Sequence, residues 1–137
     1  DDSCELVIKR FGLPMKNVLS GVRRSEFYNP GSIVKINVDR RSDLARGVAD
    51  ELPAYFINSS AFEEVRDGSR TLKVIARYAE KDALMSGWML GEKLINGKIA
   101  LAEAGYGKGK IVLFAFRPQH RGQTYATFPL LFNSLER

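Results

Sequence analysis

The sequence is short of the residues on which many kinds of protein site depend. It has a single cysteine, Cys4, which has no partner for an internal disulfide. It has a single histidine, His120, whereas catalytic zinc sites usually take two or three imidazole ligands. No apolar run approaches the roughly 20 residues that a membrane-spanning helix needs. A disulfide scaffold, a zinc hydrolase site and a membrane partner are therefore not expected.

The remaining composition is typical of a globular domain. With 137 residues, of which 45% are hydrophobic and 27% charged, the chain fits one domain over residues 1–137. The net charge is +5, but the basic residues form short clusters in separate segments. These clusters are Lys9-Arg10, Arg23-Arg24, Arg40-Arg41 and Lys108 to Lys110. No nucleic-acid-binding motif accompanies them, so we expect no nucleic-acid partner.

Turn signals and alternating hydrophobicity predict several strands. Residues 32–38 alternate apolar and polar side chains, which is typical of a half-buried strand. We expect residues 39–52 to form a loop with a short helical turn, followed by a brief strand at residues 54–57. Asp67-Gly68 predicts a turn between residues 62–65 and 71–78, so these segments are possible hairpin partners. Residues 5–11 could be helical or extended.

The second half of the chain predicts a hairpin and a terminal helix. Residues 98–104 and 110–116 have the pattern of two strands joined by Gly105-Tyr-Gly-Lys-Gly109. This loop resembles a phosphate-binding loop, but a strand rather than a helix follows it, which favours the hairpin. Apolar residues at helical spacing then predict a helix that begins near Thr127, a possible N-cap, with Pro129 in its first turn.

A polar cluster follows the most apolar stretch of the chain. Residues 111–116 are all apolar, as in a strand covered on both faces of a parallel or mixed sheet. Ligands of open α/β sheets gather beyond the carboxyl ends of such strands. The candidate ligand-binding residues are therefore Arg117, Gln119, His120 and Arg121.

Several roles are open for these residues. Arg117 and Arg121 could clamp a carboxylate or a phosphate, or they could hold the loop through bonds to carbonyls and acids. His120 could act as a base with Ser86 or Cys4, although neither lies in a nucleophile elbow. Trp88 and the apolar residues around it could line a pocket, but such a cluster is more often core.

Five motifs of the chain together resemble the C-terminal region of large bacterial zinc carboxypeptidase-like proteins. These motifs are Arg10-Phe-Gly-Leu-Pro14, Tyr28-Asn-Pro-Gly-Ser32, Ala54-Tyr-Phe-Ile-Asn-Ser-Ser-Ala-Phe62, Ser86-Gly-Trp-Met-Leu-Gly-Glu92 and Phe116-Arg-Pro-Gln-His-Arg-Gly-Gln-Thr124. The resemblance implies an α/β fold of the class I glutamine amidotransferase type, which is a flavodoxin-like three-layer sandwich. The chain would be part of such a domain, with a mixed sheet and a C-terminal hairpin and helix, at the end of a longer protein.

The resemblance also implies a noncatalytic role. In active class I amidotransferases a late strand ends in Phe-His-Pro-Glu, and the matching residues here are Phe116-Arg-Pro-Gln119. Arginine does not deprotonate and glutamine has no ionised form, so neither can transfer the proton. We therefore expect an accessory binding or assembly domain of a secreted or periplasmic protein that hydrolyses C-terminal peptide bonds. The chain itself would carry no cofactor, zinc would be held in the parent's catalytic domain, and the partner would be that domain or a second copy.

Overall fold

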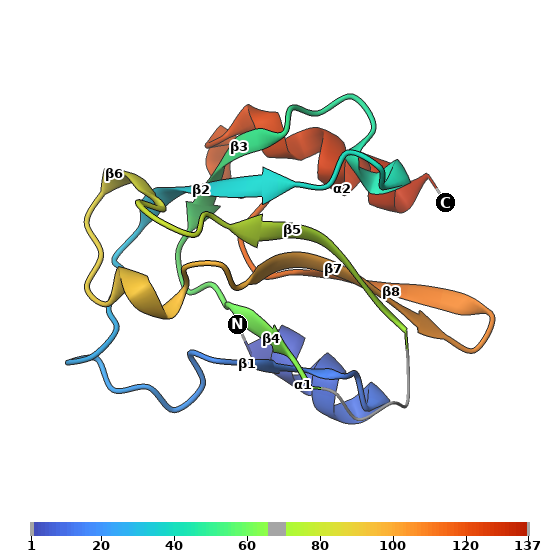
Figure 1. Cartoon of the computed structure of the whole chain (residues 1–137), viewed down its shortest axis with the longest axis horizontal. Coiled ribbons are helices and arrows are strands. Elements are labelled where there is room, and N and C mark those ends of the chain that lie inside the picture. The colour runs from blue at the N-terminus through green and yellow to red at the C-terminus, as the bar shows by residue number, and fades with distance from the viewer. Residues whose placement is uncertain (1, 66–70, 137) are drawn as a thin grey trace.

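The computed structural model describes residues 2–65 and 71–136 (Figure 1). Its strands are β1 (Met15–Asn17), β2 (Ser32–Val38), β3 (Glu51–Phe56), β4 (Phe62–Glu64), β5 (Leu72–Tyr78), β6 (Leu84–Gly87), β7 (Ile99–Tyr106) and β8 (Gly109–Phe114). Its α-helices are α1 (Asp2–Phe11) and α2 (Phe128–Leu135). Four short 3-10 helices are η1 (Asp43–Ala45), η2 (Glu92–Leu94), η3 (His120–Gly122) and η4 (Tyr125–Thr127). Among these described helices, none is long and apolar enough to cross a membrane.

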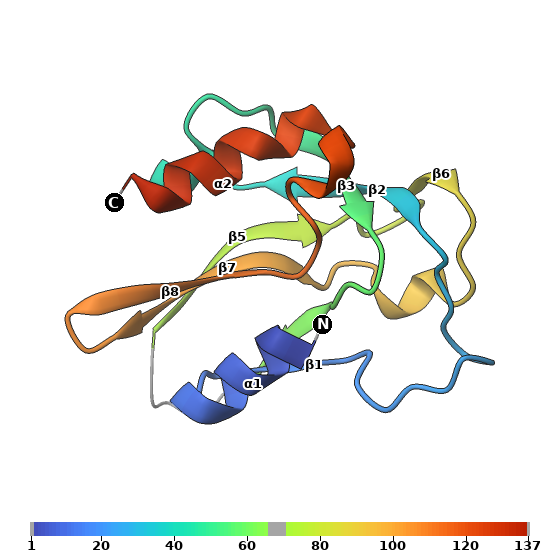
Figure 2. The same ribbon diagram turned by 180° about the vertical axis from the view of Figure 1, so that it is seen from behind.

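The strands form one sheet in which every described pairing is antiparallel. The order is β1-β4-β7-β5-β2-β3, while β6 pairs with β2 and β8 pairs with β7. An antiparallel bridge between Tyr55 of β3 and Arg117, just after β8, links two segments that are far apart along this order. In both views α1 lies beside β1 and β4 at one end of the strand order, and α2 lies beside β2 and β3 at the other (Figures 1 and 2). The strand-end segment of the chain is therefore tied to the opposite edge of the sheet.

The α/β character, the C-terminal hairpin and the C-terminal helix are confirmed, but the flavodoxin-like sandwich is wrong. A parallel strand pair needs a crossover of a dozen or more residues, usually a helix. Here both α-helices lie at the ends of the described chain, and no α-helix lies between the described strands to form such a crossover. The predicted mixed sheet is antiparallel in all its described pairings for the same reason.

The core lies where the sequence alternates most cleanly. The predicted strand at residues 32–38 is β2, and its inward residues Val34 and Ile36 are fully buried. Strand β3 begins at Glu51, earlier than the predicted residue 54. The expected hairpin between β4 and β5 does not form, because β7 pairs with both and lies between them. The predicted turn at Asp67-Gly68 lies outside the described residues.

The chain ends behave largely as the apolar spacing predicts. Residues 2–11 are helical, which settles the open choice for residues 5–11. Strands β7 and β8 meet in a tight turn at Gly107, whose φ of 56° suits glycine. Helix α2 follows Thr127, but the Thr127 hydroxyl bonds the carbonyls of Pro118 and Thr124 instead of capping the helix. Thr127 thus ties the helix to the segment after β8.

Candidate functional site

Arg117 is fastened to strand β3 by two hydrogen bonds. Its backbone N–H donates to the carbonyl oxygen of Tyr55 (3.1 Å), and its side-chain Nε donates to the carbonyl oxygen of Ile57 (3.1 Å). The residue is half-buried, so these bonds are shielded from water. Arg117 therefore joins the end of β8 to β3 through hydrogen bonds.

Of the other three candidates, His120 also contacts Tyr55, whereas Gln119 and Arg121 are exposed. The ring of His120 stacks on Tyr55 with a centroid separation of 4.9 Å and an interplanar angle of 19°. Arg121 is exposed and has a left-handed backbone with φ 48°, and Gln119 is exposed. Arg117 lines a cavity. The structure thus places the four residues in one loop, with Arg117 and His120 both against Tyr55.

The cavity beside Arg117 is polar and has a volume of about 620 Å³. It is lined by Glu5, Asn17, Leu19, Ser20, Gly21, Asn58, Ser59 and Arg117. The Glu5 carboxylate accepts hydrogen bonds from Asn17 Nδ2 (2.8 Å) and Ser20 Oγ (3.2 Å). Because this carboxylate shares the cavity with Arg117, it opposes the binding of an anion there.

The two nucleophiles considered for His120 lie on other elements, Cys4 on α1 and Ser86 on β6. Cys4 Sγ donates to the carbonyl oxygen of Phe114 (3.5 Å), and burial raises the pKa of the Cys4 thiol. Ser86 lies in β6 opposite Ile33 of β2. Within residues 2–65 and 71–136, no group of three or more metal-ligating side chains gathers. Between described residues, no hydrogen bond joins His120 to Cys4 or Ser86, as a Ser-His or Cys-His pair would need.

A second region stands out because large apolar side chains are exposed there. Trp88 is 53% exposed and Met85 is 51% exposed, and Leu90 is also exposed. The preference for core at this cluster is therefore wrong for these three residues. Tyr28 lies beside Trp88 with a ring-centroid separation of 6.0 Å and pairs with Leu90 in an antiparallel bridge. We call Tyr28, Trp88 and Leu90 the Trp88 surface.

Two glycines hold the loop that carries Trp88. Gly87 has φ 92°, and a Cβ there would lie 3.0 Å from the Gly31 carbonyl oxygen. Gly91 has φ 79°, and a Cβ there would overlap the carbonyl oxygen of Glu26. Between them, Leu90 N–H donates to Tyr28 O (2.9 Å). The loop is thus closely packed on the segment before β2, and the Gly-x-x-x-Gly spacing around Trp88 was the available sequence signal.

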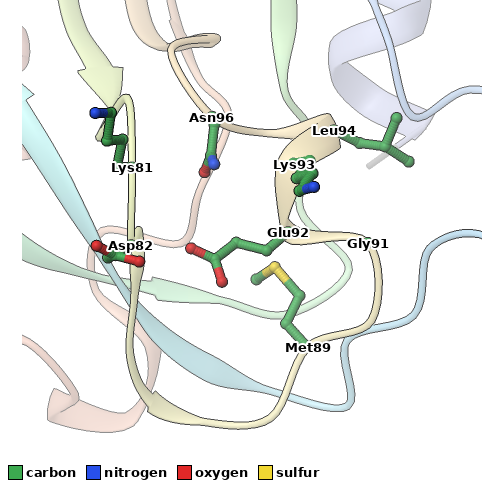
Figure 3. Close-up of a pocket in the computed structure, with 8 residues that line it drawn as sticks. All are labelled: Lys81, Asp82, Met89, Gly91, Glu92, Lys93, Leu94 and Asn96. Atoms are coloured by element: carbon green, nitrogen blue, oxygen red, sulfur yellow. The ribbon is translucent and has the colours of Figure 1, made fainter.

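Charged and polar groups surround the Trp88 loop. Arg24 Cζ lies 5.6 Å from the centroid of the Tyr28 ring, in a cation–π arrangement. On the other side, Met89 and Glu92 point into a cavity of about 600 Å³, and the Asp82 carboxylate faces Glu92 across it (Figure 3). One carboxylate oxygen of Glu92 accepts from the Leu84 N–H (3.3 Å). The apolar surface therefore has a polar and charged border.

Comparisons with known proteins do not assign a family. No protein-family model matches the chain, and no curated protein matches it. In the geometry described above, Arg117 and His120 of the loop after β8 pack on the segment around β3. The loop that carries Trp88 instead exposes apolar side chains.

Proposed function

We propose that this chain is a noncatalytic binding module that docks through the Trp88 surface onto the catalytic domain of a zinc carboxypeptidase-like protein. The observation that carries the proposal is the exposure of Trp88 on a closely packed loop. Tryptophan and tyrosine are enriched among the residues that dominate the binding energy of protein interfaces.

The packing of the loop favours binding over accidental exposure. Association costs free energy wherever flexible groups become ordered. The backbone around Trp88 is already held by the Tyr28–Leu90 bridge and by the close approach at Gly91, so little ordering remains. Burying the exposed half of a tryptophan contributes about 2 kcal/mol at the usual area coefficient.

The hydrogen bonds of the strand-end loop support the noncatalytic part of the proposal. The Arg117 side chain donates a hydrogen bond to the Ile57 carbonyl, and the His120 ring stacks on Tyr55. Arginine cannot replace the histidine of an amidotransferase as a proton carrier. Enzyme and anion-binding alternatives centred on this loop therefore gain no support from its geometry.

The partner is proposed from the resemblance described above. The domain that would hold the zinc and hydrolyse C-terminal peptide bonds is the expected occupant of the Trp88 surface, in a secreted or periplasmic protein. The zinc and its ligands would belong to that domain. A second copy of this chain is the competing occupant, and light scattering distinguishes the two.

The test uses the only tryptophan of the chain as a reporter. Titration with the separately produced carboxypeptidase domain should shift Trp88 emission to the blue and reduce its quenching by acrylamide. In calorimetry, Trp88→Ala should weaken binding at least tenfold. The matched control is Tyr125→Ala, which removes a 74% exposed aromatic ring elsewhere and should leave affinity unchanged.

Three outcomes would contradict the proposal. If Trp88→Ala and the unaltered chain bind with equal affinity, the Trp88 surface is not the docking site. If light scattering shows a dimer and Trp88→Ala makes it monomeric, the partner of the Trp88 surface is a second copy of the chain and not the carboxypeptidase domain. Hydrolysis of peptide or amide substrates by the purified chain, abolished by His120→Ala, would overturn the noncatalytic assignment.

A further inference from the structure

Strand β8 has one edge that no described strand covers. The Ala115 N–H donates to the Ala100 carbonyl (2.9 Å), toward β7. Because the direction of backbone groups alternates along an antiparallel strand, the N–H and C=O groups of Lys110 and Val112 point away from β7. The next outward carbonyl, that of Phe114, is occupied by Cys4 Sγ. The open part of the edge therefore comprises Lys110 and Val112.

A cavity of about 400 Å³ lies beside this open edge. Lys108, Gly109, Lys110 and Val112 form its wall on the hairpin side, and Asp43 of η1 and Ser134 of α2 form the other. Figure 2 shows β8 running below α2, with the hairpin end projecting past it. An extended segment placed along β8 would direct alternate side chains into this cavity.

The charge around the open edge is mainly positive. Lys108 and Lys110 border the cavity, and the contact of Phe11 with Tyr106 (4.8 Å between ring centroids) brings the last turn of α1 to the hairpin. That turn contributes Lys9 and Arg10.

Few acids offset these four cations. Lys110 pairs with the buried Glu103 carboxylate (3.1 Å), while Lys9, Arg10 and Lys108 form no ion pair with a described residue. Asp43 is the one acid among the cavity-lining residues given above. The edge therefore favours a partner with acidic side chains.

We propose that the outer edge of β8 binds an extended acidic peptide segment, which adds to the sheet as a further antiparallel strand. Unpaired N–H and C=O groups in a strand register are matched by another backbone, which a nucleic acid does not supply. A second copy of the chain would bring its own Lys108 and Lys110 to the same edge and carries a net charge of +5. Acidic side chains on the added strand would instead pair with Lys108.

The backbone part of the proposal is tested with a proline. The probe is a fluorescently labelled seven-residue peptide of alternating glutamate and valine, and binding is followed by anisotropy. Val112→Pro removes an outward N–H without removing a bond to β7, so it should weaken binding at least tenfold while the melting temperature stays close to that of the unaltered chain. Val112→Ala is the matched control, because it shortens the same side chain and keeps the N–H.

The charge part is tested with matched lysine variants. Lys108→Glu should weaken binding of the acidic peptide several-fold, whereas Lys81→Glu, an exposed lysine before β6, should leave it unchanged. A peptide with lysine in place of glutamate should bind more weakly than the acidic one. If all of these results are obtained, the outer edge of β8 binds an added strand and prefers acidic side chains on it.

Other results would overturn the proposal. Absence of binding at millimolar peptide, or equal affinity of Val112→Pro and Val112→Ala, would exclude strand addition. Binding of a single-stranded oligonucleotide that is lost in Lys108→Glu and kept in Val112→Pro would identify a general polyanion surface. Trp88→Ala should not change peptide binding, so this inference and the proposed docking of a carboxypeptidase domain can fail separately.

Discussion

The loop that follows β8 and the loop that carries Trp88 use their side chains in opposite ways. The first contains arginine, glutamine and histidine, which are residues typical of a site, yet Arg117 and His120 pack on β3. The second contains apolar residues typical of a core, yet Trp88 and Leu90 are exposed. Residue type alone therefore did not separate the side chains that pack on β3 from those that are exposed.

The difference has a physical cause in how the sheet is arranged. The segment after β8 runs beside β3, where the Arg117 N–H donates to the Tyr55 carbonyl and the Arg117 side chain donates to the Ile57 carbonyl just past the strand. The Trp88 loop follows β6, which pairs with β2 in a register that shifts between Ile33 and Val34 and is mostly exposed. Burial of the Trp88 side chain would need an element that the described residues do not provide.

The largest expected effect breaks the Trp88 loop itself. Gly91→Ala would place a Cβ against the Glu26 carbonyl at φ 79°, so we expect a loss of more than about 3 kcal/mol in unfolding free energy. Gly12→Ala is the control, because φ is 57° and nothing lies within 4 Å of its Cβ, so it should lose about 1 kcal/mol. Urea denaturation measures both. Equal losses would mean that the loop is not closely packed.

The next effect tests the strand-end loop as a structural fastening. Arg117→Ala would remove one of the two hydrogen bonds that the Ile57 carbonyl accepts, the other coming from Ser59 Oγ, and we expect a loss of about 1 kcal/mol. Arg121→Ala, at an exposed position in the same loop, should change stability by less than about 0.5 kcal/mol. Thermal and urea unfolding would both report the contrast. An unchanged stability in Arg117→Ala would reopen a ligand role for its side chain.

Cys4 offers a kinetic measurement on the same half of the molecule. Burial raises the pKa of its thiol, so at pH 8 the folded chain should hold less thiolate than the unfolded chain. Alkylation by iodoacetamide should therefore be at least tenfold slower in the native protein than in guanidinium chloride. A native rate as fast as the denatured one would instead mark Cys4 as an activated nucleophile.

The smallest effect concerns an exposed ion pair outside both loops. Hydrogen bonds from the Arg41 side chain lower the pKa of Asp39 from 3.8 to about 2. A lowered carboxyl pKa contributes stability above pH 3.8, and this contribution is lost as the pH falls through about 2. In an NMR titration, Arg41→Ala should raise the pKa of Asp39 toward its ordinary value, while Arg40→Ala should not. No change in Arg41→Ala would show that the pair does not persist in solution.

Local patterns in the sequence predicted several elements well. The alternation in residues 32–38 and the glycine-rich turn before β8 are short-range signals, and both elements form where expected. The helix after Thr127 follows from apolar spacing and from the position of Pro129. Strand partners depend instead on contacts between distant segments, which is why the expected pairing of β4 with β5 was wrong.

The sequence predicted where the candidate residues lie along the chain but not what they contact. The sequence located Arg117, Gln119, His120 and Arg121 after a strand, but the expected convergence at a strand end assumed parallel strands. In the antiparallel sheet, the carboxyl ends of neighbouring strands point in opposite directions. The polar residues that follow these strands therefore do not gather at one end of the sheet. The spacing of Gly87 and Gly91 around Trp88 indicated a closely packed loop, which composition and hydrophobicity alone do not indicate.

By itself, the sequence determined the local conformations that depend on residue spacing and on turn chemistry: β2, the β7–β8 hairpin and α2. The tertiary structure alone decided that the sheet is antiparallel, that Arg117 fastens its ends and that Trp88 is exposed. The reason is that hydrophobic periodicity records how one segment meets its surroundings. Which distant backbone supplies those surroundings is decided only when the whole chain packs.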